Sequence, residues 1–149
     1  MFHFGYGSNL SIEFVQEKLI PNAKLVMKGY LPNFEVRFPF WSEEVQGGYS
    51  GIMEAPGELV QGALYEVTEQ ELIELDDLDV YKDLYRRETF LVLGEDGEFH
   101  PADLYRVTEP KGPSPPSRGY VEIMLSGAKN LGLDPDYIEK IEEFHRQSQ

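Results

Sequence analysis

The sequence contains no cysteine. This absence excludes a disulfide scaffold, a thiol nucleophile and a thiolate metal site. Basic residues are also scarce, because 13 lysines and arginines stand against 27 aspartates and glutamates, which leaves a formal net charge of −14. The negative electrostatic field of such a charge repels nucleic acids and anionic membrane surfaces, so we expect neither class of partner.

The chain also lacks a long apolar run and a basic, apolar leader before its first predicted strand. We therefore expect a cytoplasmic protein with no membrane partner. The 149 residues, of which 41% are hydrophobic and 13% aromatic, fit one globular domain spanning residues 1–149. The sequence leaves open whether two copies form a homodimer.

A predicted strand, a glycine turn and a helix start follow one another at the beginning of the chain. Phe2 and Phe4 alternate with His3, which is the period-two pattern of a strand with one buried face. Gly5 and Gly7 allow a sharp turn and a close backbone approach, because neither carries a Cβ. Helix-capping types and helically spaced apolar residues follow: Ser8, Asn9, Ser11, Ile12, Phe14, Val15 and Leu19. The unpaired backbone N–H groups of such a turn suit a carboxylate, a phosphate or a developing oxyanion.

Further strands are predicted at 25–30, 34–38, 47–53, 60–67, 88–93 and 102–107. Residues 55–58 predict a turn, and Asp96-Gly97 predicts a hairpin. A capping box, Thr68 with Glu71, opens one helix, and two more begin at Tyr120 and at Asp134-Pro135. The fold class that we predict is α+β (mixed α/β), a small curled or closed β-barrel of six to seven strands with helices packed outside.

The helix that Thr68 opens ends among three carboxylates, Asp76, Asp77 and Asp79. Carboxylates at this end oppose the helix dipole, and the same placement favours a raised pKa where burial adds to it. Two interpretations stay open. The segment is either a solvated acidic helix end or the source of a general base beside the anion-binding turn.

The stretch Tyr6-Gly7-Ser8-Asn9-Leu10 resembles the signature loop of the γ-glutamylcyclotransferase family. The resemblance continues, in order, over nearly the whole chain. Its further motifs are Gly47-Gly48, Pro56-Gly57, Glu71-Leu72-x-x-Leu75-Asp76, Tyr85-x-Arg87, Pro115-Pro116-Ser117-x-x-Tyr120 and Gly127-Ala128-Lys129. The fold that this resemblance implies is γ-glutamylcyclotransferase-like.

The resemblance implies an enzyme that converts a γ-glutamyl peptide or amine into 5-oxoproline and a free amine, within glutathione metabolism. It implies a small-molecule substrate and no cofactor or metal. The backbone of the loop would hold the γ-glutamyl group and stabilise the oxyanion, Asp79 would be the general base, and two tyrosines would line the pocket. The residues concerned are Tyr6, Gly7, Ser8, Asn9, Leu10, Asp79, Tyr85 and Tyr120.

One departure from the family pattern concerns the base. The family places a glutamate, usually before glycine or another small residue, where this chain has Asp79-Val80, and the segment up to Tyr85 is one residue shorter. Aspartate is one methylene shorter, about 1 Å, and a misplacement of that size can cost roughly a hundredfold in rate. Two functions therefore stay open: an active cyclotransferase, and a catalytically impaired module that binds a γ-glutamyl group or another small carboxylate. Glu54 and Glu88 are outside candidates for the base.

Other chemistries have weaker support. The three histidines, His3, His100 and His145, lack helical metal-ligand spacing. Ser8 has no histidine or aspartate that the sequence places as a triad partner. Arg87 and Arg118 are candidates for binding a substrate carboxylate, although surface or ion-paired roles are the alternative for both.

Overall fold

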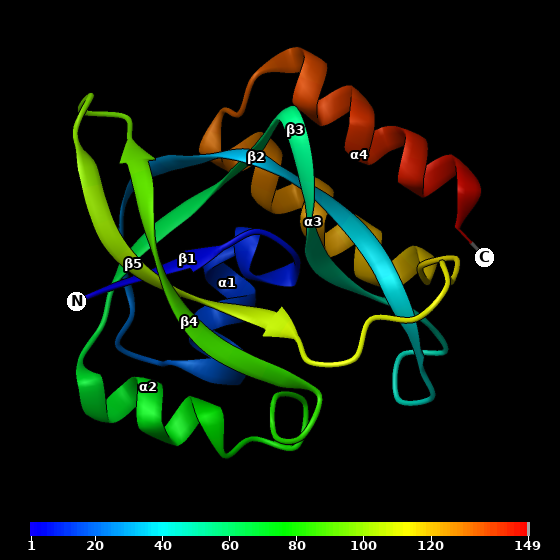
Figure 1. The fold of residues 1–149 in the computed structure, drawn as a ribbon, viewed down its shortest axis with the longest axis horizontal. Coiled ribbons are helices and arrows are strands. Elements are labelled where there is room, and N and C mark those ends of the chain that lie inside the picture. The colour runs from blue at the N-terminus through cyan, green and yellow to red at the C-terminus, as the bar shows by residue number, and fades with distance from the viewer. Residues whose placement is uncertain (149) are drawn as a thin grey trace.

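The computed structural model describes residues 1–148. Five strands form a closed barrel in the order β1-β3-β2-β4-β5 (Figure 1). They are β1 (Phe2–Gly5), β2 (Lys24–Ser42), β3 (Gly47–Glu66), β4 (Tyr85–Gly94) and β5 (Phe99–Val107). β1 pairs antiparallel with β3 on one side and parallel with β5 on the other, which closes the barrel. The predicted fold class is confirmed.

The part of the chain that the structure describes has five strands, where the sequence predicted six to seven. The segments 25–30 and 34–38 are two halves of β2, and 47–53 and 60–67 are two halves of β3. The predicted turn at 55–58 is a bulge, because the pairing passes from Pro32 with Leu59 to Phe34 with Glu54. Gly57 has a φ of 85°, and its N–H donates to the Asn33 side chain at 3.0 Å. The turn residues therefore bend two paired strands without reversing the chain.

The first predicted helix is divided into three short pieces. They are η1 (Ser8–Leu10, 3₁₀), α1 (Ile12–Phe14) and η2 (Val15–Leu19, π-helical). The other helices are α2 (Glu69–Asp76), α3 (Arg118–Leu131) and α4 (Pro135–Gln147). α2 begins with the predicted capping box. The Glu71 N–H donates to the Thr68 hydroxyl, and the Thr68 N–H donates to the Glu71 carboxylate. No helix within residues 1–148 is long and apolar enough to cross a membrane.

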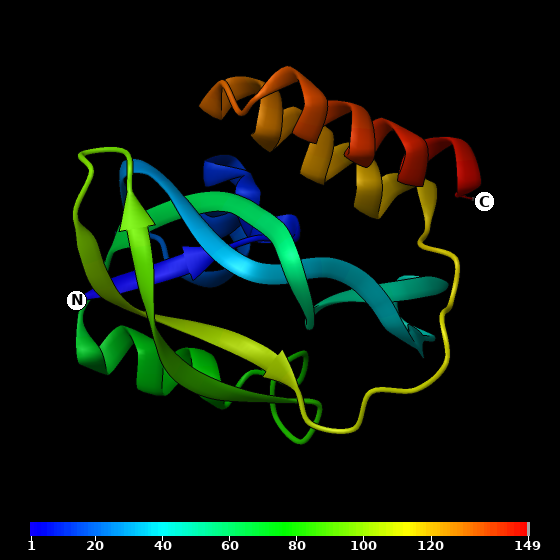
Figure 2. The same cartoon turned by 45° about the horizontal axis from the view of Figure 1, so that its top comes forward.

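The helices cover the barrel on two sides. α3 and α4 run side by side over one side, and α2 lies on the other (Figure 2). Three apolar clusters hold these layers together: one inside the barrel, one between η1, α3 and α4, and one beneath α2. The turn after β1 lies where these clusters meet, since Tyr6 belongs to the first and Leu10 to the second. That position makes the turn part of the rigid centre of the molecule.

Candidate functional site

A pocket of about 770 Å³ opens at the turn after β1. The turn, the start of β3, the segment between α2 and β4 and the start of α3 all contribute to its lining. Seven of the eight predicted site residues line it together: Tyr6, Gly7, Ser8, Asn9, Asp79, Tyr85 and Tyr120. Leu10 does not reach it, because its side chain is buried between η1 and α3 and its N–H donates to the Gly7 carbonyl at 3.0 Å.

The two glycines of the turn allow an approach that a side chain would block. A Cβ at Gly5 would lie 2.5 Å from the backbone oxygen of Asn9, and one at Gly7 would lie 2.2 Å from Ser50 Oγ. The close approach expected from the sequence is therefore present. Within residues 1–148, the backbone N–H groups of Gly7 and Asn9 have no protein acceptor, whereas that of Ser8 contacts the Tyr120 hydroxyl at 3.3 Å. Two N–H groups thus remain available to an anion beside the pocket.

Tyrosines form much of the pocket wall, and the hydroxyls of the three that the sequence identified each have a defined partner. The Tyr6 hydroxyl donates to the Tyr105 carbonyl at 2.6 Å, and the Tyr85 hydroxyl donates to the Ser50 carbonyl. The Tyr120 hydroxyl lies 2.7 Å from Ser50 Oγ. Burial raises the pKa of Tyr6 and of Tyr85 well above the usual value, so both remain neutral. The result is a rigid, largely apolar wall with neutral hydroxyl groups.

A chain of side-chain hydrogen bonds runs from the barrel interior to the pocket. His3 Nδ1 lies 3.1 Å from the Asp103 carbonyl, and His3 Nε2 lies 3.0 Å from Asn9 Nδ2. Because a carbonyl only accepts, Nδ1 carries the proton and Nε2 accepts from Asn9. The second Asn9 N–H donates to the Tyr81 hydroxyl at 3.1 Å. Burial lowers the pKa of His3 to about 4, so the ring is neutral at pH 7.

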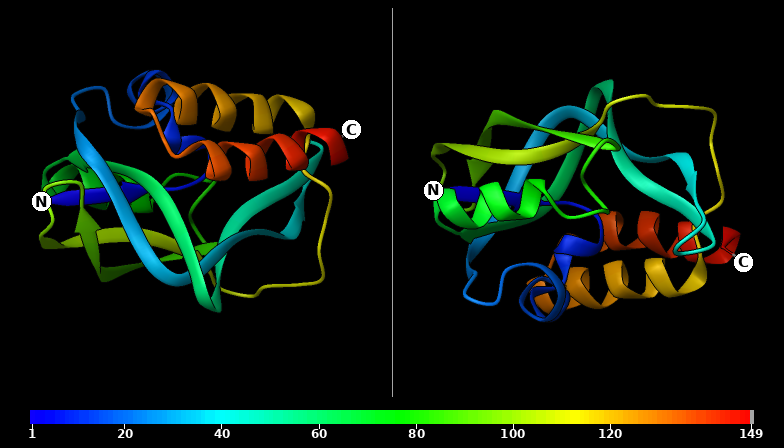
Figure 3. Two further views of the ribbon diagram at one scale, coloured as in Figure 1. Left: turned by 90° about the horizontal axis from the view of Figure 1, so that it is seen from above. Right: turned by 90° about the horizontal axis from the view of Figure 1, so that it is seen from below.

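The segment 77–84, between α2 and β4, brings Asp79 to the pocket; Figure 3 gives the views of the ribbon from above and below. Among residues 1–148, Asp79 and Glu44 are the only carboxylates in the pocket lining. Asp79 is exposed at the pocket rim, and no described side chain within residues 1–148 donates a hydrogen bond to it. Glu54 and Glu88, the less favoured candidates for the general base, do not line the pocket. Of the predicted acids, Asp79 alone therefore lines the pocket that opens at the turn after β1.

Asp76 and Arg87 belong to a separate polar network. The Arg87 guanidinium donates to Asp76 at 3.0 Å and to Asp103 at 2.5 Å, and the Tyr105 hydroxyl donates to Asp76 at 2.6 Å. These residues line a second, smaller cavity of about 330 Å³. Arg87 is thus ion-paired, and neither it nor Arg118 lines the first pocket. This network anchors the end of α2, from which the segment with Asp79 departs.

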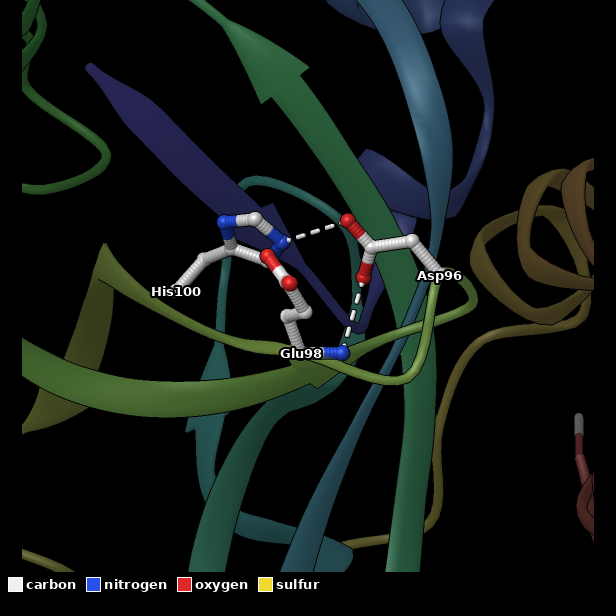
Figure 4. Close-up of side chains that lie close together, drawn as sticks. All are labelled: Asp96, Glu98 and His100. Atoms are coloured by element: carbon white, nitrogen blue, oxygen red, sulfur yellow. Dashed lines mark hydrogen bonds and ion pairs between the residues drawn. The ribbon is translucent and has the colours of Figure 1, made fainter.

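The three histidines lie on different elements, His3 on β1, His100 on β5 and His145 on α4. Within residues 1–148, the one cluster with metal-ligand types is Asp96, Glu98 and His100 (Figure 4). Asp96 accepts from the Glu98 N–H at 3.1 Å and lies 2.9 Å from His100 Nε2, so it shapes the exposed β4–β5 hairpin. The Ser8 hydroxyl donates to Asn9 and not to a histidine. The arrangement of a serine triad is therefore absent from the described residues.

The sequence did not identify Tyr81, Ser50 or Tyr105 as pocket residues. Tyr81 lies two positions after Asp79, and that proximity was the one local signal. The hydrogen-bond partners of all three are distant in sequence, which single-sequence patterns do not report.

Comparisons with known proteins converge on one family. The family model described as "Gamma-glutamyl cyclotransferase, AIG2-like" matches residues 3–122. The human protein "Gamma-glutamylcyclotransferase" is 29% identical over 144 residues, covering 93% of this chain and 76% of that protein, and the mouse protein of the same name is 28% identical over the same shares. A solved structure titled "Gamma-glutamyl cyclotransferase" superposes with a TM-score of 0.88 at 28% identity, covering 95% of this chain and 86% of that one.

Proposed function

The chain belongs to the gamma-glutamyl cyclotransferase, AIG2-like family, and on this premise we propose that it converts a γ-glutamyl amine or peptide into 5-oxoproline and a free amine. The observation that carries the proposal is that Asp79 and the turn after β1 line one pocket. Its volume of about 770 Å³ is within the range of small-molecule sites.

The reaction needs no oxidant, reductant or second substrate. The α-nitrogen of the γ-glutamyl group forms a bond to the γ-carbonyl carbon, and the bond from that carbon to the leaving amine breaks. One proton leaves the α-nitrogen and one arrives on the leaving nitrogen. Folding the substrate so that its α-nitrogen meets its own carbonyl is the main requirement, because proximity and orientation supply much of the rate.

The pocket offers a group for each remaining task. The N–H groups of Gly7 and Asn9 stabilise the negative charge that develops on the γ-carbonyl oxygen. The Asp79 carboxylate takes the proton from the α-nitrogen and returns it to the leaving amine. Tyr6, Ser8, Tyr85 and Tyr120 shape the pocket around the substrate, and Leu10 supports the turn from the core.

The test measures 5-oxoproline release from γ-glutamyl amino acids, γ-glutamyl amines and glutathione. We expect the wild type to turn over at least one of them and Asp79→Asn to lose 100-fold or more in kcat, in the range of general acid–base effects of about 10²–10⁴. Glu44→Gln is the matched control, since Glu44 is the other carboxylate of the lining. We expect it to keep its rate within about threefold. Asp79→Glu moves the carboxylate by about 1 Å, so we expect a smaller loss, up to roughly a hundredfold.

Two results would contradict this proposal. Equal rates for the wild type and Asp79→Asn would remove Asp79 from the mechanism. If only Asp79→Glu released 5-oxoproline, while the wild type bound 5-oxoproline without turnover, the result would instead support the impaired binding module. The identity of the substrate, the link to glutathione metabolism and the cytoplasmic location stay predictions.

A further inference from the structure

Tyr81 lies in the pocket but has no part in the roles assigned above. It lies two residues after Asp79, and its ring stacks on that of Tyr105 with the centroids 4.1 Å apart and the planes at 23°. This stacking on Tyr105 restricts the Tyr81 ring to one orientation. The position of its hydroxyl is therefore fixed relative to Tyr105 and Asn9.

The hydrogen bonds behind Tyr81 determine which way its hydroxyl acts. The Asn9 amide uses one N–H toward His3 and the other toward the Tyr81 oxygen, and its own oxygen accepts from Ser8 at 3.4 Å. The Tyr81 hydroxyl is thus an acceptor from Asn9. Within residues 1–148 it donates to no protein atom, so its proton is available to a ligand in the pocket. Burial raises the pKa of Tyr81 above the usual value, which keeps that proton in place at neutral pH.

The γ-glutamyl group has a second anionic feature that needs a donor. Its α-carboxylate is bonded to the same carbon as the α-amine, so it must lie close to the base that deprotonates the amine. Asp79 and Glu44 are carboxylates, and Lys18 on η2, which is exposed, is the one lysine or arginine that the described residues contribute to the lining. A carboxylate beside Asp79 is repelled unless a donor compensates the like charge. Tyr81 lines the same pocket as Asp79, two residues further along the chain, and its hydroxyl can supply such a donor.

We propose that the Tyr81 hydroxyl donates a hydrogen bond to the α-carboxylate of the bound γ-glutamyl group. The inference rests on the proposed function for the identity of the ligand. It makes Tyr81 a specificity residue, which separates γ-glutamyl groups from acyl groups that lack the α-carboxylate.

Tyr81→Phe tests this, because it keeps the ring stacked on Tyr105 and removes only the hydroxyl. The probes are 5-oxoproline and 2-pyrrolidinone, the same lactam without the carboxylate, with affinities measured by titration calorimetry or NMR. We expect the variant to bind 5-oxoproline about tenfold to a hundredfold more weakly, as for a lost hydrogen bond to a charged group. Its affinity for 2-pyrrolidinone stays within about twofold of the wild type. In turnover, KM rises while kcat stays within about threefold, because the carboxylate keeps its charge through the transition state.

Tyr65→Phe is the matched control. The Tyr65 hydroxyl donates to the Asn9 carbonyl at 2.6 Å but does not line the pocket, so its loss disturbs Asn9 without removing a ligand donor. An equal loss of 5-oxoproline affinity in both variants would show that Tyr81 acts through Asn9 and overturn the proposal. Three other results would also overturn the proposal. Tyr81→Phe could weaken the binding of both lactams equally, or it could leave the affinity for 5-oxoproline unchanged. The third result is a wild type that does not bind 5-oxoproline.

The binding assay separates this inference from the proposed function. Turnover by the wild type with no effect of Tyr81→Phe contradicts the inference alone. Carboxylate-dependent binding through Tyr81 without turnover by any variant supports the inference and contradicts the cyclotransferase activity.

Discussion

Replacing His3 by glutamine should flatten the dependence of folding stability on pH below neutrality. Burial lowers the pKa of His3 to about 4 in the folded protein, against the ordinary histidine value of 6.5. Between these values the unfolded chain binds the proton and the folded one does not. The contribution of His3 to stability is therefore complete above about pH 6.5 and is lost as the pH falls toward 4.

The magnitude follows from the two pKa values. Each unit of difference corresponds to about 1.4 kcal/mol, so the full effect is about 3 kcal/mol. The sequence pI of about 4.5 makes precipitation a concern near pH 4, so the useful range is pH 7 to 5. Over that range the linkage relation gives a loss of about 2 kcal/mol in the free energy of unfolding.

Urea unfolding followed by circular dichroism at half-unit pH steps measures this difference. The wild type should lose about 2 kcal/mol more than His3→Gln between pH 7 and pH 5. His145→Gln, on α4, is the control variant and should follow the wild-type curve. Parallel curves for the wild type and His3→Gln would refute the reasoning. The folded protein keeps Nε2 unprotonated over this range, so its hydrogen bond from Asn9 is retained and should not itself change the activity.

Three further substitutions test parts of the fold by urea unfolding at pH 7. Gly5→Ala should destabilise the protein by about 2 kcal/mol, because the new Cβ meets backbone 2.5 Å away, whereas Gly112→Ala, with no atom within 4 Å, should change little. Thr68→Ala should cost about 1 kcal/mol by removing the cap of α2, and an unchanged midpoint would show that the cap is dispensable. Arg87→Met should cost about 2–3 kcal/mol, because Asp103 keeps a largely buried carboxylate without its guanidinium; a neutral result would contradict the importance of this ion pair.

Local signals in the sequence predicted much of the molecule correctly. The capping box at Thr68, the hairpin at Asp96-Gly97 and the proline at the start of α4 depend on residues within one turn of chain. The glycine turn after β1 was equally readable, since the residue types that permit it adjoin one another. The family resemblance, and not a local pattern, implied that Asp79 and this turn belong to one candidate site; both line one pocket, and the role of Asp79 as base stays a prediction.

Features that depend on distant partners were less accessible. The turn at 55–58 could not be distinguished from a bulge, because only the continued pairing of β2 with β3 decides between them. The π-helical η2 was predicted as ordinary helix. The side-chain hydrogen bonds from Asn9 to His3 and to Tyr81 join β1 to a segment more than 70 residues away. No periodic pattern in the sequence encodes such a contact.

The most direct test of the account is a crystal structure of Asp79→Asn with a γ-glutamyl substrate bound. The account predicts the α-nitrogen within about 3 Å of the residue 79 side chain. It also predicts the γ-carbonyl oxygen at a similar distance from the N–H groups of Gly7 and Asn9. A substrate bound outside this pocket, or one whose α-nitrogen lies away from residue 79, would contradict it.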